Sequence, residues 1–175
     1  MTIRPSSTRK TASRAGVQQR TMLSVVMQFR VVVRSMRRHY QSVERAVGVT
    51  GAQLWAMAEI DASPQMTVGQ LARDLAIHQS TASNIVADLE AAGLITRERP
   101  REDQRVVRLA LTAAGRRIMR RAPRPLRGAL QEALMSLPPA RLSALHRDLA
   151  AVIAHLDGGD PDARHELLSQ VIVRS

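Results

Sequence analysis

The sequence predicts a mainly α-helical fold in which two short helices and a β-hairpin lie between longer helices. Apolar residues recur every three or four positions over most of the 175 residues, as on the buried face of a helix. One stretch, residues 95–111, instead alternates between apolar and polar residues around a charged segment that contains a proline. Alanine, leucine and arginine are frequent and cysteine is absent, which also favours a helical class.

A helix, a tight turn and a second helix are predicted over residues 67–92. Thr67 and Gln70 have the spacing of a capping box at the start of the first helix. The second helix begins at Gln79 and stops before Gly93, where a left-handed residue is needed. Its positions 82, 85, 86 and 89 are apolar and are expected to be buried, whereas positions 80, 83, 84 and 87 point the opposite way. This outer face carries small polar residues, which a DNA major groove admits.

A β-hairpin is predicted next, with strands at 95–99 and 106–111. The segment between them contains Pro100 and several charges, so we expect an exposed tip rather than sheet. Arginines gathered on such a tip suit DNA phosphates or a minor groove. The residues expected there are Arg97, Arg99, Arg101 and Arg105, with Asp103 close enough to orient the guanidinium group of Arg105.

On the N-terminal side, a long amphipathic helix is predicted over residues 17–47, after a basic arm at 1–16 that is expected to be disordered. A shorter helix, residues 51–60, should begin behind a second capping box formed by Thr50 and Gln53. Trp55 in this helix is expected in the core, with a ligand pocket as the alternative.

On the C-terminal side, Thr112 is expected to cap a helix that kinks or breaks at Pro123 and Pro125. Helical spacing of apolar residues resumes at 126–137 and again in a last helix that ends near residue 156. These two segments have apolar faces without an evident partner in the chain, which favours pairing with a second copy about a two-fold axis. An intramolecular helical hairpin is the alternative. No role is assigned to the tail, residues 157–175.

Basic charge is concentrated in two regions of a chain whose net charge is +11. Residues 1–45 hold ten basic residues against one acidic residue, and residues 97–127 hold eleven arginines against three acidic residues. Such a distribution indicates a polyanionic partner. A generally arginine-rich proteome is the alternative, although it does not explain a basic tip between two strands.

Several motifs in the central region resemble those of the multiple-antibiotic-resistance regulator (MarR) family. They are LExAGLI at residues 89–95, the D-x-R of Asp103 and Arg105, and LTxxG at Leu111, Thr112 and Gly115. The resemblance covers Val17 to Leu156. It implies a winged helix-turn-helix (48–112) with a small β-hairpin wing, flanked by N-terminal (17–47) and C-terminal (113–156) dimerisation helices.

The resemblance implies a homodimer that binds a palindromic double-stranded DNA operator as a transcription regulator, most simply a repressor. The second helix has no lysine or arginine, so electrostatic attraction should come from the wing and the arm, and affinity should depend strongly on salt. His78, in the N-cap position, could cap, contact a phosphate or simply be tolerated. The predicted DNA-binding residues are Gln79, Ser80, Thr81, Ser83, Asn84, Arg97, Arg99, Arg101, Asp103 and Arg105.

The resemblance also implies release by a small, often aromatic and acidic, effector beneath the dimer helices. Ligand-independent binding is the alternative. The predicted pocket residues are Phe29, Met36, His39, Tyr40 and Trp55.

No enzyme motif is recognisable: the sequence has no phosphate-binding glycine loop, no metal-type cysteine cluster and no nucleophile motif. No cofactor, metal or membrane contact is therefore expected, and a cytoplasmic protein is the default. An architectural DNA-coating protein remains an alternative to a specific regulator, and a winged-helix protein-interaction module is a third possibility.

Overall fold

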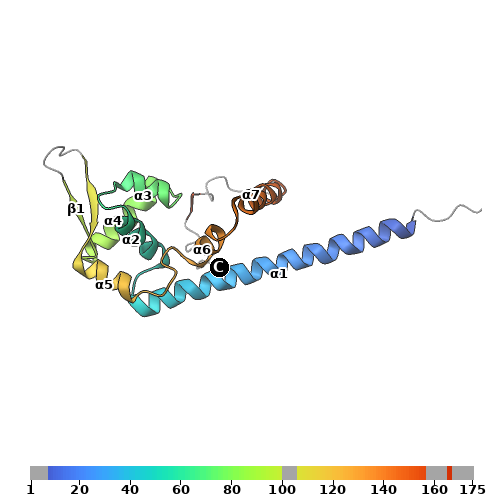
Figure 1. Cartoon of the computed structure of the whole chain (residues 1–175), viewed down its shortest axis with the longest axis horizontal. Helices are drawn as coiled ribbons and strands as arrows, with labels where there is room; N and C mark the ends of the chain where they lie inside the picture. Colours follow the sequence, from blue (N-terminus) through green and yellow to red (C-terminus); the bar gives the residue numbers. More distant parts are fainter. Residues whose placement is uncertain (1–7, 100–105, 157–164, 167–175) are drawn as a thin grey trace, which may run out of the picture. The chain divides into compact units, whose positions relative to one another are not determined.

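The structure, a computed structural model, describes residues 8–99, 106–156 and 165–166 (Figure 1). The chain divides into two compact units, Met1–Ser35 and Met36–Ser175. Helix α1 (Thr8–Val47) contributes its first part to one unit and its last part to the other.

Helix α1 begins at Thr8, nine residues before the predicted start at Val17. The prediction of a disordered arm was therefore wrong for residues 8–16, whereas residues 1–7 lie outside the described part. The segment has no apolar period, but it contains no proline and only one glycine, and its Arg, Lys and Ala residues favour helix. Large apolar side chains are exposed along the part of α1 in the first unit: Val17, Met22, Leu23, Val25, Val26, Met27, Phe29, Val31, Val32 and Val33.

The second unit has the predicted mainly helical architecture with one two-stranded antiparallel sheet. Helix α2 (Gly51–Ala62), helix α3 (Val68–Asp74), helix α4 (Gln79–Ala91) and the hairpin of β1 (Ile95–Glu98) and β2 (Arg108–Leu111) pack around one core, which α5 (Ala113–Arg121) joins (Figure 1). Helices α6 (Ala129–Met135) and α7 (Pro139–Ile153) follow.

This core is aliphatic, as three aromatic residues in the whole chain require. Its fully buried side chains come from every element between the last turns of α1 and β2, and no charged side chain is buried in the described part of the chain. The largest of them are Leu54, Met57, Ile60, Leu71, Leu89, Ile95 and Leu109.

Both predicted capping boxes are confirmed. The Thr50 hydroxyl accepts from the Gln53 amide at 3.2 Å, and the Thr50 amide donates to the Gln53 side chain at 2.9 Å. Thr67 and Gln70 make the same pair of bonds at the start of α3. Each box satisfies two backbone amides that an uncapped helix N-terminus would leave to water.

The end of α4 is fixed by a glycine, as predicted. Gly93 has φ of 67°, the Leu94 amide donates to the Leu89 carbonyl at 2.9 Å, and the Gly93 amide donates to the Glu90 carbonyl at 2.9 Å. This pair of bonds is the Schellman motif, which stops the helix and turns the chain into β1.

The LTxxG motif ties α5 to the same turn. The Thr112 amide donates to the Leu94 carbonyl at 3.0 Å. The Thr112 hydroxyl donates to the Gly93 carbonyl at 2.8 Å, with a longer contact of 3.2 Å to the Leu94 carbonyl, and accepts from the Gly115 amide at 3.0 Å. A Cβ at Gly115 would overlap the Leu94 carbonyl oxygen. The motif is therefore a close junction between the end of α4, the open end of the hairpin and the first turn of α5.

The prolines interrupt the helix after the wing, as predicted. Helix α5 ends at Arg121, and helical structure resumes only at Ala129. No residue of α6 or α7 is buried, and Leu142, Val152 and Ile153 on α7 are exposed.

The loop between α5 and α6, residues 122–128, which we call the proline loop, is held against α2 by one acidic residue. Arg127 donates to both carboxylate oxygens of Glu59, at 2.6 and 3.0 Å, and the indole of Trp55 donates to Oε1 at 2.7 Å. Burial by itself raises the pKa of Glu59, but the hydrogen bonds from Arg127 and Trp55 and the charge of Arg127 outweigh it. The pKa of Glu59 is therefore lowered, and the carboxylate stays charged in contact with both partners.

Candidate nucleic-acid interface

Helix α4 has the two faces that its sequence predicts. Ala82, Ile85, Val86 and Leu89 are buried in the core. On the other side, Gln79, Ser80 and Asn84 are exposed, and Thr81 and Ser83 are half-buried at its flanks. The N-terminal half of α4 thus presents hydrogen-bonding side chains to solvent from a rigidly packed helix.

Ser83 is partly committed to the helix itself. Its hydroxyl donates to the Gln79 carbonyl one turn earlier, at 2.8 Å. The hydrogen of this hydroxyl is used in that bond, so towards a ligand Ser83 offers mainly the lone pairs of its oxygen.

His78 occupies the N-cap of α4 without capping it. Its backbone has the extended conformation of an N-cap residue, φ −62° and ψ 146°, but its side chain makes no capping bond. Its ring instead lies 4.7 Å, centre to centre, from that of His165. Of the three roles considered for His78, capping is therefore wrong.

Serine at position 78 is expected to raise the free energy of unfolding by about 0.5–1 kcal/mol, because its hydroxyl would accept from an unpaired amide in the first turn. Urea denaturation followed by circular dichroism measures the change. His78→Ala removes the same ring contact without adding a cap, so equal stability of the two variants would contradict a capping effect.

The wing pairs Ile95 with Leu111 and Glu98 with Arg108, in antiparallel register. Both strands are shorter than predicted, since the first ends at Glu98 rather than Arg99 and the second begins at Arg108 rather than residue 106. Arg99 is exposed just beyond β1. Arg101, Asp103 and Arg105 lie outside the described residues.

Arg97, one of the predicted wing arginines, forms an ion pair with Glu90. Its Nε lies 2.8 Å from Glu90 Oε2 on the last turn of α4, and both side chains remain partly exposed. This pair links β1 to α4, a contact between neighbouring elements that the spacing of charges alone does not reveal.

Arg108 was not singled out from the sequence, although it begins the second strand of the wing. Its Nη1 donates to the Gln65 side chain at 3.2 Å, while the amide of its neighbour Leu109 donates to the Met66 carbonyl at 2.9 Å. These contacts attach the second strand of the wing, near its tip end, to the loop before α3. The wing and α4 are thereby held on one scaffold.

The five predicted effector-pocket residues do not share one environment. Met36 is buried, whereas His39, Tyr40 and Trp55 are half-buried in the second unit. Phe29 belongs to the first unit and is 45% exposed.

Two of these residues already have structural partners. The Tyr40 ring packs so closely on Gly51 that a Cβ there would overlap it, and the indole of Trp55 is bonded to Glu59. Burial lowers the pKa of His39, partly offset by a hydrogen bond to the Pro125 backbone. Burial also raises the pKa of Tyr40, partly offset by the Gln131 side chain. This region is therefore well packed where α1 meets the proline loop.

Neither a metal site nor a membrane span is found in the described ranges 8–99, 106–156 and 165–166. No group of three or more His, Cys, Asp or Glu side chains lies together there as potential metal ligands. Within the same ranges, every helix is too short or too polar to cross a membrane.

A model of the MarR family matches residues 47–106, from the end of α1 to the far side of the wing. This segment contains α2, α3, α4 and β1, together with all the residues predicted to contact DNA. No curated protein sequence matches the chain.

Solved structures share the fold over most of the chain. A MepR-like protein complexed with pseudoligands has a TM-score of 0.54 and 17% identity, covering 74% of this chain and 91% of that one. A MarR family transcription regulator has a TM-score of 0.53 and 24% identity, covering 78% and 91%. Streptococcus pneumoniae FabT in complex with DNA has a TM-score of 0.52 and 21% identity, covering 77% and 94%. The chain thus shares its fold with these solved structures, and residues 47–106 are similar to the MarR family.

Proposed function

We propose that this protein is a sequence-specific DNA-binding transcription regulator, most simply a repressor, that binds a palindromic operator as a homodimer. The observation that carries the proposal is the exposed polar face of α4 beside a charged hairpin, both held on one core. A helix of this kind fits a major groove, and arginines on a wing suit the adjacent phosphates or minor groove. Such a function also goes with the predicted cytoplasmic location.

Base readout is assigned to Gln79, Ser80, Ser83 and Asn84, with Thr81 at a phosphate. Gln and Asn side chains pair well with adenine edges, whereas Ser is permissive. The FabT structure, a complex with DNA, supports the same use of this fold. Arg99, Arg101 and Arg105 supply charge from the wing, with Asp103 orienting Arg105.

Dimerisation is supported by apolar surface that the single chain leaves open. Large aliphatic side chains are exposed on α1 in the first unit and on α7 in the second, and exposed apolar surface of this kind marks interaction sites. Light scattering of the purified protein should give twice the mass of one chain. A monomer at micromolar concentration would contradict this part of the proposal.

The decisive experiment is an anisotropy titration against the DNA upstream of the protein's own gene, with random duplex as competitor. A specific regulator should prefer its operator by about a thousandfold or more. An architectural DNA-coating protein is the second candidate, because α4 carries no lysine or arginine and the net charge is +11. If random duplex competes for the protein as well as the operator does, the result would favour that candidate.

Asn84→Ala and Arg99→Gln should separate readout from electrostatic attraction. Loss of the exposed Asn84 amide should weaken operator binding about tenfold while leaving random-duplex binding nearly unchanged. Loss of the Arg99 charge should weaken both DNAs alike and reduce the salt slope by about one. Anisotropy titrations at several salt concentrations measure both effects. Equal losses on both DNAs for Asn84→Ala would contradict its role in readout.

Release by a small aromatic acidic effector is a further part of the proposal. The half-buried His39, Tyr40 and Trp55 and the buried Met36 form its proposed contact region in the second unit, whereas Phe29, the fifth predicted residue, belongs to the first unit. Titrating candidate acids into the protein–operator complex tests it. Unchanged operator affinity would leave ligand-independent binding.

A further inference from the structure

The N-terminal end of α4 is in contact with a residue that follows the last helix of the chain. The centre of the His165 ring lies 4.7 Å from that of the His78 ring, and the two ring planes are inclined by 57°. This distance and tilt are those of an edge-to-face aromatic pair. Both histidines are exposed, as is Glu166, which follows His165. We call the two described tail residues, His165 and Glu166, the strap.

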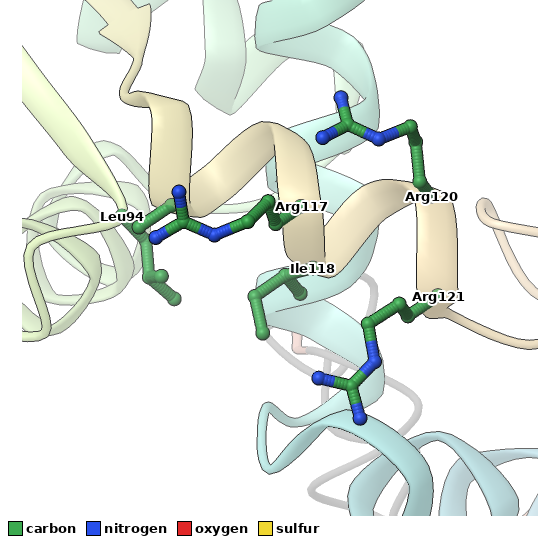
Figure 2. Close-up of a pocket in the computed structure, with 6 residues that line it drawn as sticks. Leu94, Arg117, Ile118, Arg120 and Arg121 are labelled. Atoms are coloured by element: carbon green, nitrogen blue, oxygen red, sulfur yellow. The ribbon is translucent and has the colours of Figure 1, made fainter.

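Net charge alone does not explain where the strap lies. In the sequence, residues 157–166 hold four acidic residues against one arginine, so any arginine-rich surface would attract them. Helix α5 offers such a surface, since Figure 2 shows Arg117 and Arg121 extending from it in different directions. The strap instead contacts the N-cap of α4, a helix without lysine or arginine. The ring contact, rather than general attraction to arginines, therefore accounts for its position.

The strap adds bulk at the end of α4 that is proposed to enter a major groove. A helix with its side chains is about 10–12 Å wide, and the major groove of B-DNA is about 12 Å wide, so the helix alone fills it. The ring of His165 lies beside the N-cap, next to the residues that contact base edges in a helix-turn-helix. Gln79 and Ser80 remain exposed, so the strap obstructs the groove rather than covering these side chains.

The charge of the strap also favours competition with DNA over a shared contact. Glu166 adjoins His165, so the two Cα atoms are about 3.8 Å apart. Its exposed carboxylate and the DNA phosphates have the same sign of charge, and repulsion between them acts over about 8–10 Å at ordinary salt concentrations. A phosphate bound in the first turn of α4, where Thr81 is the proposed contact, is therefore disfavoured while the strap is docked.

We propose that the strap is autoinhibitory: it docks on His78 and competes with DNA for the N-terminal end of α4. This inference rests on the proposed function, because the strap regulates the same α4 surface. Aromatic pairs of this geometry change an equilibrium by about twofold to tenfold. Operator DNA can therefore displace the strap, and the docked strap lowers the operator affinity by no more than about that factor.

A reversible cross-link between the two positions tests both the contact and its effect. The chain has no cysteine, so the full-length variant His78→Cys/His165→Cys has only the two introduced thiols. A short bifunctional methanethiosulfonate should join them within one chain, which a denaturing gel and peptide mapping would show. Operator affinity, measured by anisotropy, should fall at least tenfold and return when a reductant releases the link. The matched controls are His78→Cys and His165→Cys alone, and treatment should leave the affinity of each unchanged.

Removing the ring of His165 gives an independent measurement. His165→Ala should raise operator affinity about twofold to tenfold, because the strap no longer docks. His146→Ala removes an exposed histidine from α7 and should leave the affinity unchanged. Arg117→Gln/Arg121→Gln, introduced into the cysteine pair, lowers the positive charge of α5 and should leave the yield of the cross-link unchanged.

Four results would overturn the proposal. The first is the absence of a cross-link within one chain, and the second is a linked double variant that loses no more operator affinity than treated His78→Cys. The third is weaker operator binding by His165→Ala, which would make His165 a DNA contact. The fourth is loss of the cross-link in the α5 variant, which would mean general attraction to arginines. Failure of the proposed function is distinguishable, because the wild type would then bind no DNA while the cross-link still formed, and the strap would have no regulatory role.

Discussion

Replacing Gly115 by alanine is expected to lower the free energy of unfolding by about 2–3 kcal/mol, although alanine is the better helix former. The added methyl group would overlap the Leu94 carbonyl oxygen. That oxygen cannot move aside freely, because it accepts a hydrogen bond from the Thr112 amide and a longer one from the Thr112 hydroxyl, whose shorter bond is to the Gly93 carbonyl. Either those bonds lengthen or α5 moves away from the end of α4.

Gly69→Ala is the matched control for this prediction. Gly69 is also helical, in α3, but a Cβ there would meet nothing within 4 Å. This substitution should stabilise the protein by about 0.5–1 kcal/mol, the ordinary gain from alanine in a helix. Urea denaturation of both variants, followed by circular dichroism, gives the comparison. If Gly115→Ala were as stable as Gly69→Ala, the close junction would be wrong.

Gly115 also shows which features of the fold can be predicted from the sequence alone and which cannot. Its motif could be recognised as a pattern, and Thr112 could be predicted as a cap, because capping depends on residues close in sequence. The two capping boxes, the glycine stop after α4 and its buried face were predictable for the same reason. The requirement for glycine at position 115 was not, because it arises from Leu94, a residue of another element.

Ion pairs between residues distant in the sequence could likewise not be predicted from the sequence. The arginines at 97, 99, 101 and 105 look equivalent in the sequence, yet Arg97 is paired with Glu90. Arg127 pairs with Glu59, 68 residues away. In a chain with 25 arginines, charge counting shows the excess but not which guanidinium groups are free.

The predictions for α4, for the start of α1 and for the effector contacts show the same difference between local and distant determinants. The exposed and buried faces of α4 follow from helical periodicity and agree with the prediction, except that Ser83 on the outer face is half-buried. The start of α1 does not, because helix propensity without an apolar period gave no signal before Val17. The proposed effector contacts rested on family resemblance alone, and Tyr40 and Trp55 prove to have intramolecular partners.

Replacing Glu59 by alanine is expected to lower the free energy of unfolding by about 2 kcal/mol at neutral pH. The substitution would leave Arg127 and the Trp55 indole without their acceptor and release the proline loop from α2. Arg127 is 39% exposed, so water can replace part of what it loses, and the expected cost is set below that of a fully buried pair. Glu90→Ala, which breaks the more exposed pair with Arg97, should cost less than about 0.5 kcal/mol.

Acidification separates the charge of Glu59 from its packing. Because the folded state lowers the pKa of Glu59 below its usual value of 4.5, its stabilising effect is complete above that pH. The effect is lost as the pH falls through the lower folded-state pKa, where the carboxyl group takes up a proton. The difference in unfolding free energy between the wild type and Glu59→Ala should therefore be constant near neutrality and narrow below pH 4.5. Urea denaturation across this range measures it. A difference that stayed constant in acid would mean that Glu59 acts by packing. If Glu59→Ala lowered the free energy of unfolding no more than Glu90→Ala does, the three hydrogen bonds of Glu59 would not hold the proline loop in place.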